Sequence, residues 1–355
     1  MSRKRKKTSA FKMIFTDILV AALIIGGWFA CRYISSYTAA RKFEAKAAQA
    51  APQPTAEVTA PPKAAESPKP TEALPEITEE PVPDNRTEWQ KKFEDHFTGE
   101  IVTTDNSYSS PNVSVTVTSN TFTGEKGQSV YYVADIYVGS IDCFRSYFAH
   151  NVQYPNRTDL MYRMVEESGA IAAINGDYCG FSFGGVVRRN GVTYINSPNG
   201  ADICILYYNG EMKCFTSQEY SAMDLEDESI YQIWTFGPAL MDGSGRGFAE
   251  NEMDIPYYLA GVNPRTALGY YEPGHYCFVV VDGRQNGYSV GIQMGELASI
   301  MESLGCTQAY NLDGGGSSMM YLNGELANKP STEGDRDIPD ILLITDISDG
   351  EGAEQ

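Results

Sequence analysis

The spacing of apolar and polar positions separates strand-like from helix-like segments. Residues 113–118 alternate Val with Ser or Thr, which predicts a half-buried strand, and residues 129–138 favour a second strand. Residues 159–168 and 295–304 carry apolar side chains three and four positions apart, as on one face of a helix, and a glycine follows each segment. We expect two amphipathic helices there, the first capped by Thr158.

Turn residues and apolar runs predict further strands and hairpins. Asn190-Gly191 and Asn209-Gly210 are typical of hairpin turns, and the apolar residues 170–174 predict a short buried strand. In the C-terminal third, an apolar strand expected over 276–281 and a second strand expected over 307–312 enclose the helix expected over 295–304, which indicates a βαβ-like unit. The sequence thus predicts a single globular domain of the mixed α/β (α+β) class over residues 85–348, with a mixed, largely antiparallel sheet.

The N-terminal residues predict an anchor and a stalk. A basic run, residues 2–7, precedes an apolar stretch, residues 13–31, that as a helix would span about 28 Å. We expect a cytoplasmic segment (1–12), a single-pass transmembrane anchor (13–34), a disordered Pro/Ala/Glu-rich stalk (35–84) and an acidic tail (349–355). A cleaved signal peptide or a lipoprotein signal is the alternative. Each interpretation places the domain outside the cytoplasm.

The net charge of the chain indicates which kind of macromolecule it can bind. Residues 1–50 hold 10 of the 27 Lys/Arg and 2 of the 46 Asp/Glu, so the rest of the chain has 17 basic and 44 acidic residues and a net charge of −27. This acidity argues against a nucleic-acid partner, because phosphate backbones bind basic surfaces.

The cysteines suit an exported domain. Six of them lie beyond Cys31 and none has a CxxC spacing, which argues against a zinc site. We expect at least one disulfide, with Cys204–Cys214 and Cys277–Cys306 as the leading pairs. Unpaired buried thiols are the alternative for each pair.

Two segments carry residue types suited to phosphate and sugar chemistry. One is Asp313-Gly314-Gly315-Gly316-Ser317-Ser318, where glycines let backbone N–H groups approach an anion and Asp313 adds a carboxylate. In the other, Arg265 precedes a strand-like segment, and a guanidinium suits bidentate contact with phosphate. From spacing alone, a plain tight turn and a structural arginine stay open as alternatives.

A series of short blocks in one order resembles the phosphodiester glycosidase family, which includes the N-acetylglucosamine-1-phosphodiester α-N-acetylglucosaminidases. The blocks are residues 173–178, 236–240, 263–269, 281–284, 295–298, 304–306, 311–318 and 328–331. The most specific are Arg265-Thr266-Ala267 and Leu312-Asp313-Gly314-Gly315-Gly316-Ser317. Bacterial members are often described as exopolysaccharide-related. The resemblance implies a hydrolase that cleaves a sugar-1-phosphodiester bond in a cell-surface glycan or glycoconjugate.

The resemblance also implies roles for particular residues. It assigns bond cleavage to the carboxylates Asp313 and Glu296, with Asp282 and Asp177 in reserve. It assigns phosphate and substrate binding to Arg265, Asn175, Arg284, Gly314, Gly315, Gly316, Ser317 and Arg336. We predict no metal ligand and no cofactor, and a structural or catalytic Ca²⁺ or Mg²⁺ ion stays open as an alternative.

Two alternatives from other classes stay open. A non-catalytic carbohydrate- or wall-binding protein would keep the fold and the glycines but would have no need of Asp313, Asp282 and Glu296 beside Arg265. A metal-dependent phosphodiesterase would use the same carboxylates as oxygen ligands for Ca²⁺ or Mg²⁺.

Overall fold

The computed structural model describes residues 84–347, except 153–156, 180–184 and 333–334. The predicted cytoplasmic segment, anchor and acidic tail, and all but the last residue of the stalk, lie outside these residues. Within the described part of the chain, no helix has both the length and the apolar character that crossing a membrane requires.

The largest sheet has seven strands in the order β1-β2-β3-β4-β14-β13-β15, and every neighbouring pair is antiparallel. The long hairpin of β3 and β4 forms the central part of this sheet, and β14 pairs with β4. The strands are β1 (Val102–Thr103), β2 (Ser107–Ser109), β3 (Val113–Gly124), β4 (Gly127–Val138), β13 (Arg265–Glu272), β14 (His275–Val281) and β15 (Gln308–Asn311).

Two five-stranded antiparallel sheets complete the domain. One has the order β17-β16-β7-β19-β5, from β5 (Phe144–Phe148), β7 (Ala172–Asn175), β16 (Met320–Leu322), β17 (Glu325–Leu326) and β19 (Asp340–Ile344). The other has the order β11-β10-β12-β8-β9, from β8 (Gly185–Arg189), β9 (Val192–Ser197), β10 (Ile203–Tyr207), β11 (Met212–Phe215) and β12 (Ile230–Thr235). A two-stranded ladder joins β6 (Asp159–Leu160) to β18 (Asp337–Ile338).

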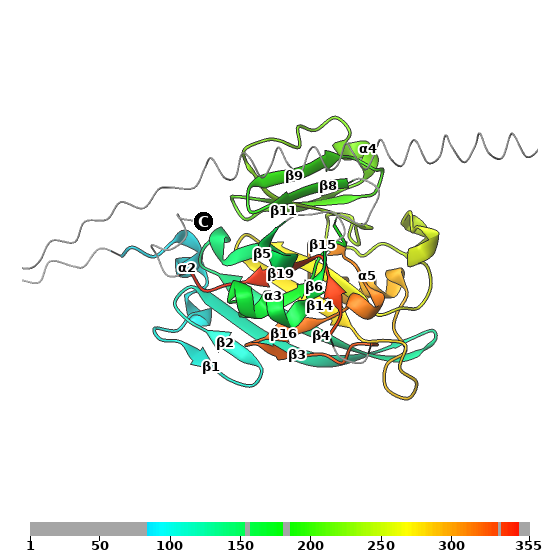
Figure 1. Ribbon diagram of the computed structural model, residues 1–355, viewed down its shortest axis with the longest axis horizontal. Coiled ribbons are helices and arrows are strands. Elements are labelled where there is room, and N and C mark those ends of the chain that lie inside the picture. The colour runs from blue at the N-terminus through cyan, green and yellow to red at the C-terminus, as the bar shows by residue number, and fades with distance from the viewer. Residues whose placement is uncertain (1–83, 153–156, 180–184, 333–334, 348–355) are drawn as a thin grey trace, which may run out of the picture. The chain divides into compact units, whose positions relative to one another are not determined.

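One buried cluster joins all three large sheets. It contains Phe278 from β14, Phe144 and Leu342 from the sheet of β5 and β19, and Leu206 and Trp234 from the sheet of β10 and β12. In Figure 1, β8, β9 and β11 form a layer above β5 and β19, and β3 and β4 lie below.

Two helices cover the outer faces of these sheets. The helix α5 (Met294–Ser303) packs its apolar face on β13 and β14, and α3 (Met161–Ser168) packs on the sheet of β7 and β19. The short helices α2 (Glu88–Lys92) and α4 (Ser217–Tyr220) lie at the periphery of Figure 1.

The predicted α+β class with a largely antiparallel sheet is confirmed. Both alternating segments are strands, both amphipathic segments are helices, and both Asn-Gly pairs connect hairpins. The βαβ-like unit is β14–α5–β15, whose two strands run parallel with β13 between them, since each is antiparallel to β13. The cap assigned to Thr158 is wrong. Leu160 is the N-cap residue of α3 and makes no side-chain cap, because residues 159 and 160 pair with β18.

Both leading cysteine pairs lie side by side as free thiols. Cys204 is directly opposite Cys214 across β10 and β11, and the Sγ atoms of Cys277 and Cys306 are 3.6 Å apart. The six described cysteines are unbonded in the structure, so the disulfides stay a prediction.

Candidate functional site

The order of strands brings three predicted site residues to one edge of the seven-stranded sheet. Strands β14 and β15 both end where β13 begins, because each is antiparallel to β13. Asp282 follows the end of β14, Asp313 follows β15 closely, and Arg265 is the first residue of β13. Polar side chains at strand ends and in the loops that follow are a common place for ligand sites.

Asn175, at the end of β7, forms hydrogen bonds that connect a second sheet to this edge. Its Nδ2 donates to the Asp313 carbonyl at 2.6 Å, and its Oδ1 accepts from Thr266 Oγ1 at 2.7 Å. The next carbonyl, that of Gly176, accepts from the Asp313 amide at 3.2 Å. Asn175 is buried. These hydrogen bonds therefore favour a structural role for Asn175, which connects two sheets, over the substrate contact that the resemblance implied.

The three glycines after Asp313 are needed for close packing. A Cβ on Gly314 would lie 2.8 Å from the Pro264 carbonyl oxygen, closer than a real side chain tolerates. The Gly315 amide donates to that same oxygen at 3.0 Å, and the Gly314 amide donates to Asp313 Oδ1 at 2.9 Å. Two of the amides expected to bind phosphate thus already have partners within the protein.

Asp313 is only partly covered at this loop, whereas the strands around it are buried. Burial raises the pKa of its carboxyl, and this outweighs the opposing effects of the Ser317 hydroxyl, the Gly314 amide and the charge of Arg336. A carboxyl of raised pKa keeps its proton more readily, so Asp313 is suited to donate one to a ligand.

Two exposed arginines lie against the glycines of this loop. A Cβ on Gly315 would be 3.1 Å from Arg284 Nη2, and one on Gly316 would be 2.9 Å from Arg336 Nη1. Glycine at both positions therefore lets the guanidinium groups approach the backbone beside Asp313. Arg284 Nη2 also donates to Asn263 Oδ1 at 2.8 Å, which holds it in place. Exposed guanidinium groups in this arrangement are suited to bind an anion.

The other three predicted carboxylates have both oxygens engaged. Asp177 binds Arg189 Nη2 at 2.7 Å and the Thr235 amide at 2.8 Å. Asp282 accepts from the side chain of Asn328 at 2.7 Å, from the Tyr288 hydroxyl at 2.8 Å and from the Lys329 amide at 3.0 Å.

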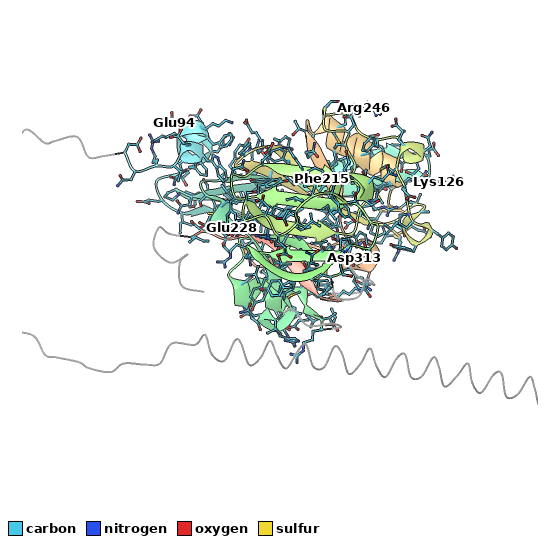
Figure 2. The ribbon with its side chains drawn as sticks, turned by 90° about the horizontal axis from the view of Figure 1, so that it is seen from above. Glu94, Lys126, Phe215, Glu228, Arg246 and Asp313 are labelled. Carbon is cyan, nitrogen blue, oxygen red and sulfur yellow. The ribbon has the colours of Figure 1, made fainter. Side chains whose placement is uncertain are left out.

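Glu296 caps the start of α5 and the β3–β4 turn. Its oxygens accept the amides of Gln293 at 2.8 Å and Glu125 at 2.9 Å. Figure 2 shows Lys126, the neighbour of Glu125, well apart from Asp313. The structure therefore brings Asp282 and Asp177 near Asp313 as positioned partners, and it does not bring Glu296 to the same place.

Arg265 reaches the expected edge but turns its side chain inward. The residue is 2% exposed, and its guanidinium donates to three carbonyls, those of Leu259 at 2.9 Å, Gly261 at 2.7 Å and Ile292 at 3.2 Å. Burial lowers its pKa to about 10. This geometry favours a role in holding backbone segments over a direct phosphate contact.

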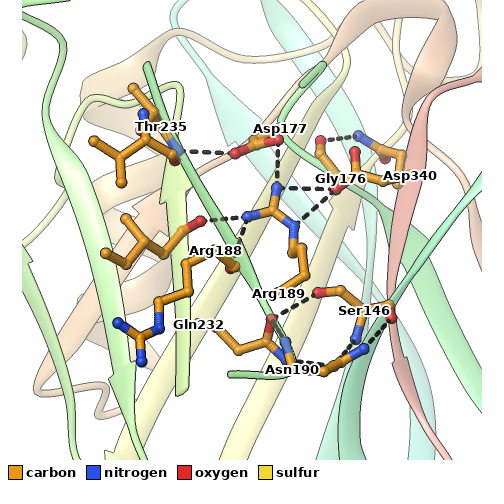
Figure 3. A network of polar contacts seen from close by, with 12 residues as sticks. Ser146, Gly176, Asp177, Arg188, Arg189, Asn190, Gln232, Thr235 and Asp340 are labelled. Carbon is orange, nitrogen blue, oxygen red and sulfur yellow. Dashed lines mark hydrogen bonds and ion pairs between the residues drawn. The ribbon is translucent and has the colours of Figure 1, made fainter. Parts of the chain in front are cut away.

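Sequence reasoning missed the buried ion network beneath Asp177, shown in Figure 3. Arg189 Nη2 binds Asp177 Oδ1 at 2.7 Å and Asp340 Oδ2 at 3.0 Å, and its Nη1 donates to the carbonyl of Ile233. Burial raises the pKa of Asp340 to about 6, although Arg189 opposes this. The available signal was the pair Arg188-Arg189, two charges that end a predicted hairpin strand directly before an Asn-Gly turn.

The same network bears on metal binding. Among the described residues, Asp177, Cys179 and Asp340 bring three donor atoms of metal-ligand type within 4.8 Å of one another. The Arg189 guanidinium already binds both carboxylates, so a cation there would face a fixed positive charge. The group fits an internal ion pair and does not fit a metal site.

A partly buried carboxyl beside two exposed guanidinium groups, at a glycine loop of an α+β fold, is an arrangement suited to a phosphate-bearing ligand. A family model for phosphodiester glycosidases matches residues 168–345, half of the chain, and the chain belongs to this family.

Two curated proteins match parts of the chain. The chain is 30% identical over 214 residues to the SPbeta prophage-derived uncharacterized protein YomE of Bacillus subtilis (strain 168), covering 58% of this chain and 32% of that protein. It is 39% identical over 70 residues to the N-acetylglucosamine-1-phosphodiester alpha-N-acetylglucosaminidase of Bos taurus, covering 20% of this chain and 13% of that protein. The chain therefore spans a third or less of the length of these relatives.

A solved structure shows the same fold. The zebrafish N-acetylglucosamine-1-phosphodiester alpha-N-acetylglucosaminidase catalytic domain, auto-inhibited by its pro-peptide, superposes with a TM-score of 0.53 at 19% identity. The match covers 70% of this chain and 88% of that chain.

Proposed function

We propose that this chain hydrolyses a sugar-1-phosphodiester, with Asp313 as the acid and with Arg284 and Arg336 on the phosphate. The observation that carries the proposal is the contrast among the four predicted carboxylates. Asp177, Asp282 and Glu296 have both oxygens engaged by other groups, whereas Asp313 is held within its own loop by the Gly314 amide and the Ser317 hydroxyl, is partly exposed and lies beside two exposed arginines.

The proposed reaction breaks the bond between the anomeric carbon and the bridging phosphate oxygen. Asp313 donates its proton to that oxygen, which leaves as a phosphate monoester, and water adds its hydroxyl to the anomeric carbon. The proton released by the water restores the Asp313 carboxyl, so the cycle balances. Arg284 and Arg336 stabilise the charge on the departing phosphate.

The test uses Asp313→Asn, Arg284→Ala and Arg336→Ala with UDP-N-acetylglucosamine and a panel of other sugar-1-phosphodiesters. Asn keeps the oxygen that accepts the Gly314 amide, so the variant should fold like the wild type. We expect each variant to lower kcat/KM by about 10²–10³. The decline of activity at high pH should disappear in Asp313→Asn, because deprotonation of this acid causes it.

Arg246→Ala is the matched control. Arg246 is an exposed arginine paired with Asp242 and Glu252, and Figure 2 shows it well apart from Asp313. Its removal should leave kcat/KM unchanged. A panel in which every compound binds and none is hydrolysed would reject the enzyme and identify the non-catalytic carbohydrate-binding alternative.

We extend the proposal to place and substrate class: a single-pass membrane protein whose domain acts on a cell-surface glycan outside the cytoplasm. The basic run before residue 13 and the apolar stretch after it support this placement. Protease added to intact spheroplasts should remove the domain and leave a small membrane-bound fragment. Protection of the whole domain would refute the orientation.

A further inference from the structure

Two neighbouring tyrosines project from the loop that leads into the site. Tyr257 is 96% exposed and Tyr258 is 74% exposed, more than any other large hydrophobic side chain in the described part of the chain. They open a short 3-10 turn, Tyr257–Leu259, that follows Pro256. Exposed apolar surface of this kind, grouped at one place, marks a binding surface more often than an isolated exposed residue does.

Hydrogen bonds from Arg265 hold the backbone of the loop that carries the two tyrosines. Leu259 is buried, and its carbonyl accepts from Arg265 Nη2 at 2.9 Å. The Gly261 carbonyl accepts from the same nitrogen at 2.7 Å. A buried guanidinium is unfavourable unless its hydrogen bonds are made, so the loop and Arg265 stabilise each other. The exposed rings therefore stand on a backbone that is fixed in place.

The same loop continues directly into the candidate site. Asn263 Oδ1 accepts from Arg284 Nη2 at 2.8 Å, and the Pro264 carbonyl accepts from the Gly315 amide at 3.0 Å. Tyr258 lies six positions before Pro264 in the sequence. Six residues span at most about 20 Å, so a ligand of a few sugar units whose phosphate lies at Arg284 is long enough to reach the part of the loop that carries these rings.

The geometry points to Tyr257 and Tyr258 as a subsite that stacks on a sugar ring of an extended glycan substrate. This inference rests on the proposed function for the identity of the ligand. A pyranose ring presents an apolar C–H face with hydroxyls around it, and tyrosine presents an apolar face with a polar tip. Tyrosine also loses little conformational entropy on binding, since it has two rotatable side-chain bonds. Arg265 is then a positioning residue that holds this subsite beside the loop of Asp313.

The test measures glycan binding apart from turnover. The Asp313→Asn protein is applied to an array of neutral and phosphodiester-linked oligosaccharides, and dissociation constants are measured for the glycans it retains. We expect the added Tyr257→Ala and Tyr258→Ala changes to raise the Kd at least about fivefold, because each ring contributes a stacking contact. Tyr257→Phe with Tyr258→Phe should retain most of the affinity, since the rings remain.

Tyr208→Ala is the control, because Tyr208 is an exposed tyrosine (44%) directly after β10. Its removal should leave the Kd unchanged. If no glycan on the array binds, or if the double alanine variant binds as well as its parent, the subsite is refuted. Loss of a dimer in the double variant, measured by sedimentation, would also refute it and assign the rings to a second copy of this chain. A failure of hydrolysis alone would count against the proposed reaction and leave this binding result intact.

Discussion

Replacing Arg189 by Met removes a guanidinium that pairs with two buried carboxylates, those of Asp177 and Asp340. Arg189 and Asp177 are each 1% exposed, and the Asp340 side chain is fully buried. Met has similar length and no charge, so the change keeps most of the volume. Besides the two ion pairs, the carbonyls of Arg188 and Ile233 lose their donor.

The expected loss of unfolding free energy depends on how the two buried carboxylates respond when Arg189 is removed. Breaking a buried ion pair by removing one partner typically costs about 3–5 kcal/mol of unfolding free energy. A carboxylate can instead take up a proton, which costs about 1.4 kcal/mol for each pH unit above its unfolded pKa. With an unfolded pKa of 3.8, this is about 5 kcal/mol at pH 7.5 and about 1 kcal/mol at pH 4.5. We therefore expect a loss of about 3–5 kcal/mol at pH 7.5.

The dependence on pH has a definite sign. Burial raises the folded-state pKa of Asp340 to about 6, above its unfolded value, so its contribution to stability declines as pH rises from about 4 to about 6. Without Arg189 the pKa of Asp340 rises further, and the decline continues above pH 6. The deficit of Arg189→Met relative to the wild type should be smallest near pH 4.5 and largest above pH 6.

Urea denaturation at pH 4.5 and 7.5 measures this directly. Arg86→Met is the matched control, because Arg86 pairs with Asp84 at 2.9 Å while both side chains are about half exposed to water. That variant should be close to the wild type at both pH values, since exposed ion pairs contribute little. A deficit for Arg189→Met below about 1 kcal/mol at pH 7.5, or one that grows toward pH 4.5, would refute the reasoning.

Two further predictions concern the packing around the site and the thiols. A Cβ at Gly176 would lie 2.1 Å from Asp340 Oδ1, and Asp340 is held by Arg189, so Gly176→Ala should destabilise the protein by about 1–3 kcal/mol. Gly99→Ala, where a Cβ meets nothing within 4 Å, is its control, and equal melting temperatures for the two variants would contradict the prediction. The Sγ atoms of Cys277 and Cys306 are 3.6 Å apart, so a small shift closes them to the roughly 2.05 Å of a disulfide in an oxidising compartment. Thiol titration of the unfolded, unreduced protein should then find this pair oxidised, and six reactive thiols beyond Cys31 would show that it is not.

Much of the frame around the site was predictable because its signals are local. The alternation in residues 113–118, the helical spacing in 295–304 and the Asn-Gly turns each depend on a few neighbouring residues. The strand–helix–strand order then places the residues after β14 and β15 at one edge, so Asp313 and Asp282 could be brought together from sequence. The glycine loop was recognisable for the same reason, since its glycines, hydroxyls and carboxylate are consecutive in the sequence, whereas the packing of Gly314 against Pro264 appears only in the folded chain.

Only the tertiary structure shows which of the predicted site residues already bind other groups of the protein. Nothing near Asp177 in the sequence indicates Asp340, which lies more than 150 positions away and shares Arg189 with it. Glu296 is engaged by the turn at Glu125, and Arg265 by carbonyls of two separate segments. A hydrogen-bond partner that comes from a distant segment leaves no local pattern, because hydrophobic periodicity records which face is buried and not which polar group it meets. For this reason the sequence by itself determined the fold class, the family and the edge that carries the site, and only the folded chain showed that Asp177, Asp282, Glu296 and Arg265 are engaged by distant groups while Arg284 and Arg336 are exposed beside the loop of Asp313.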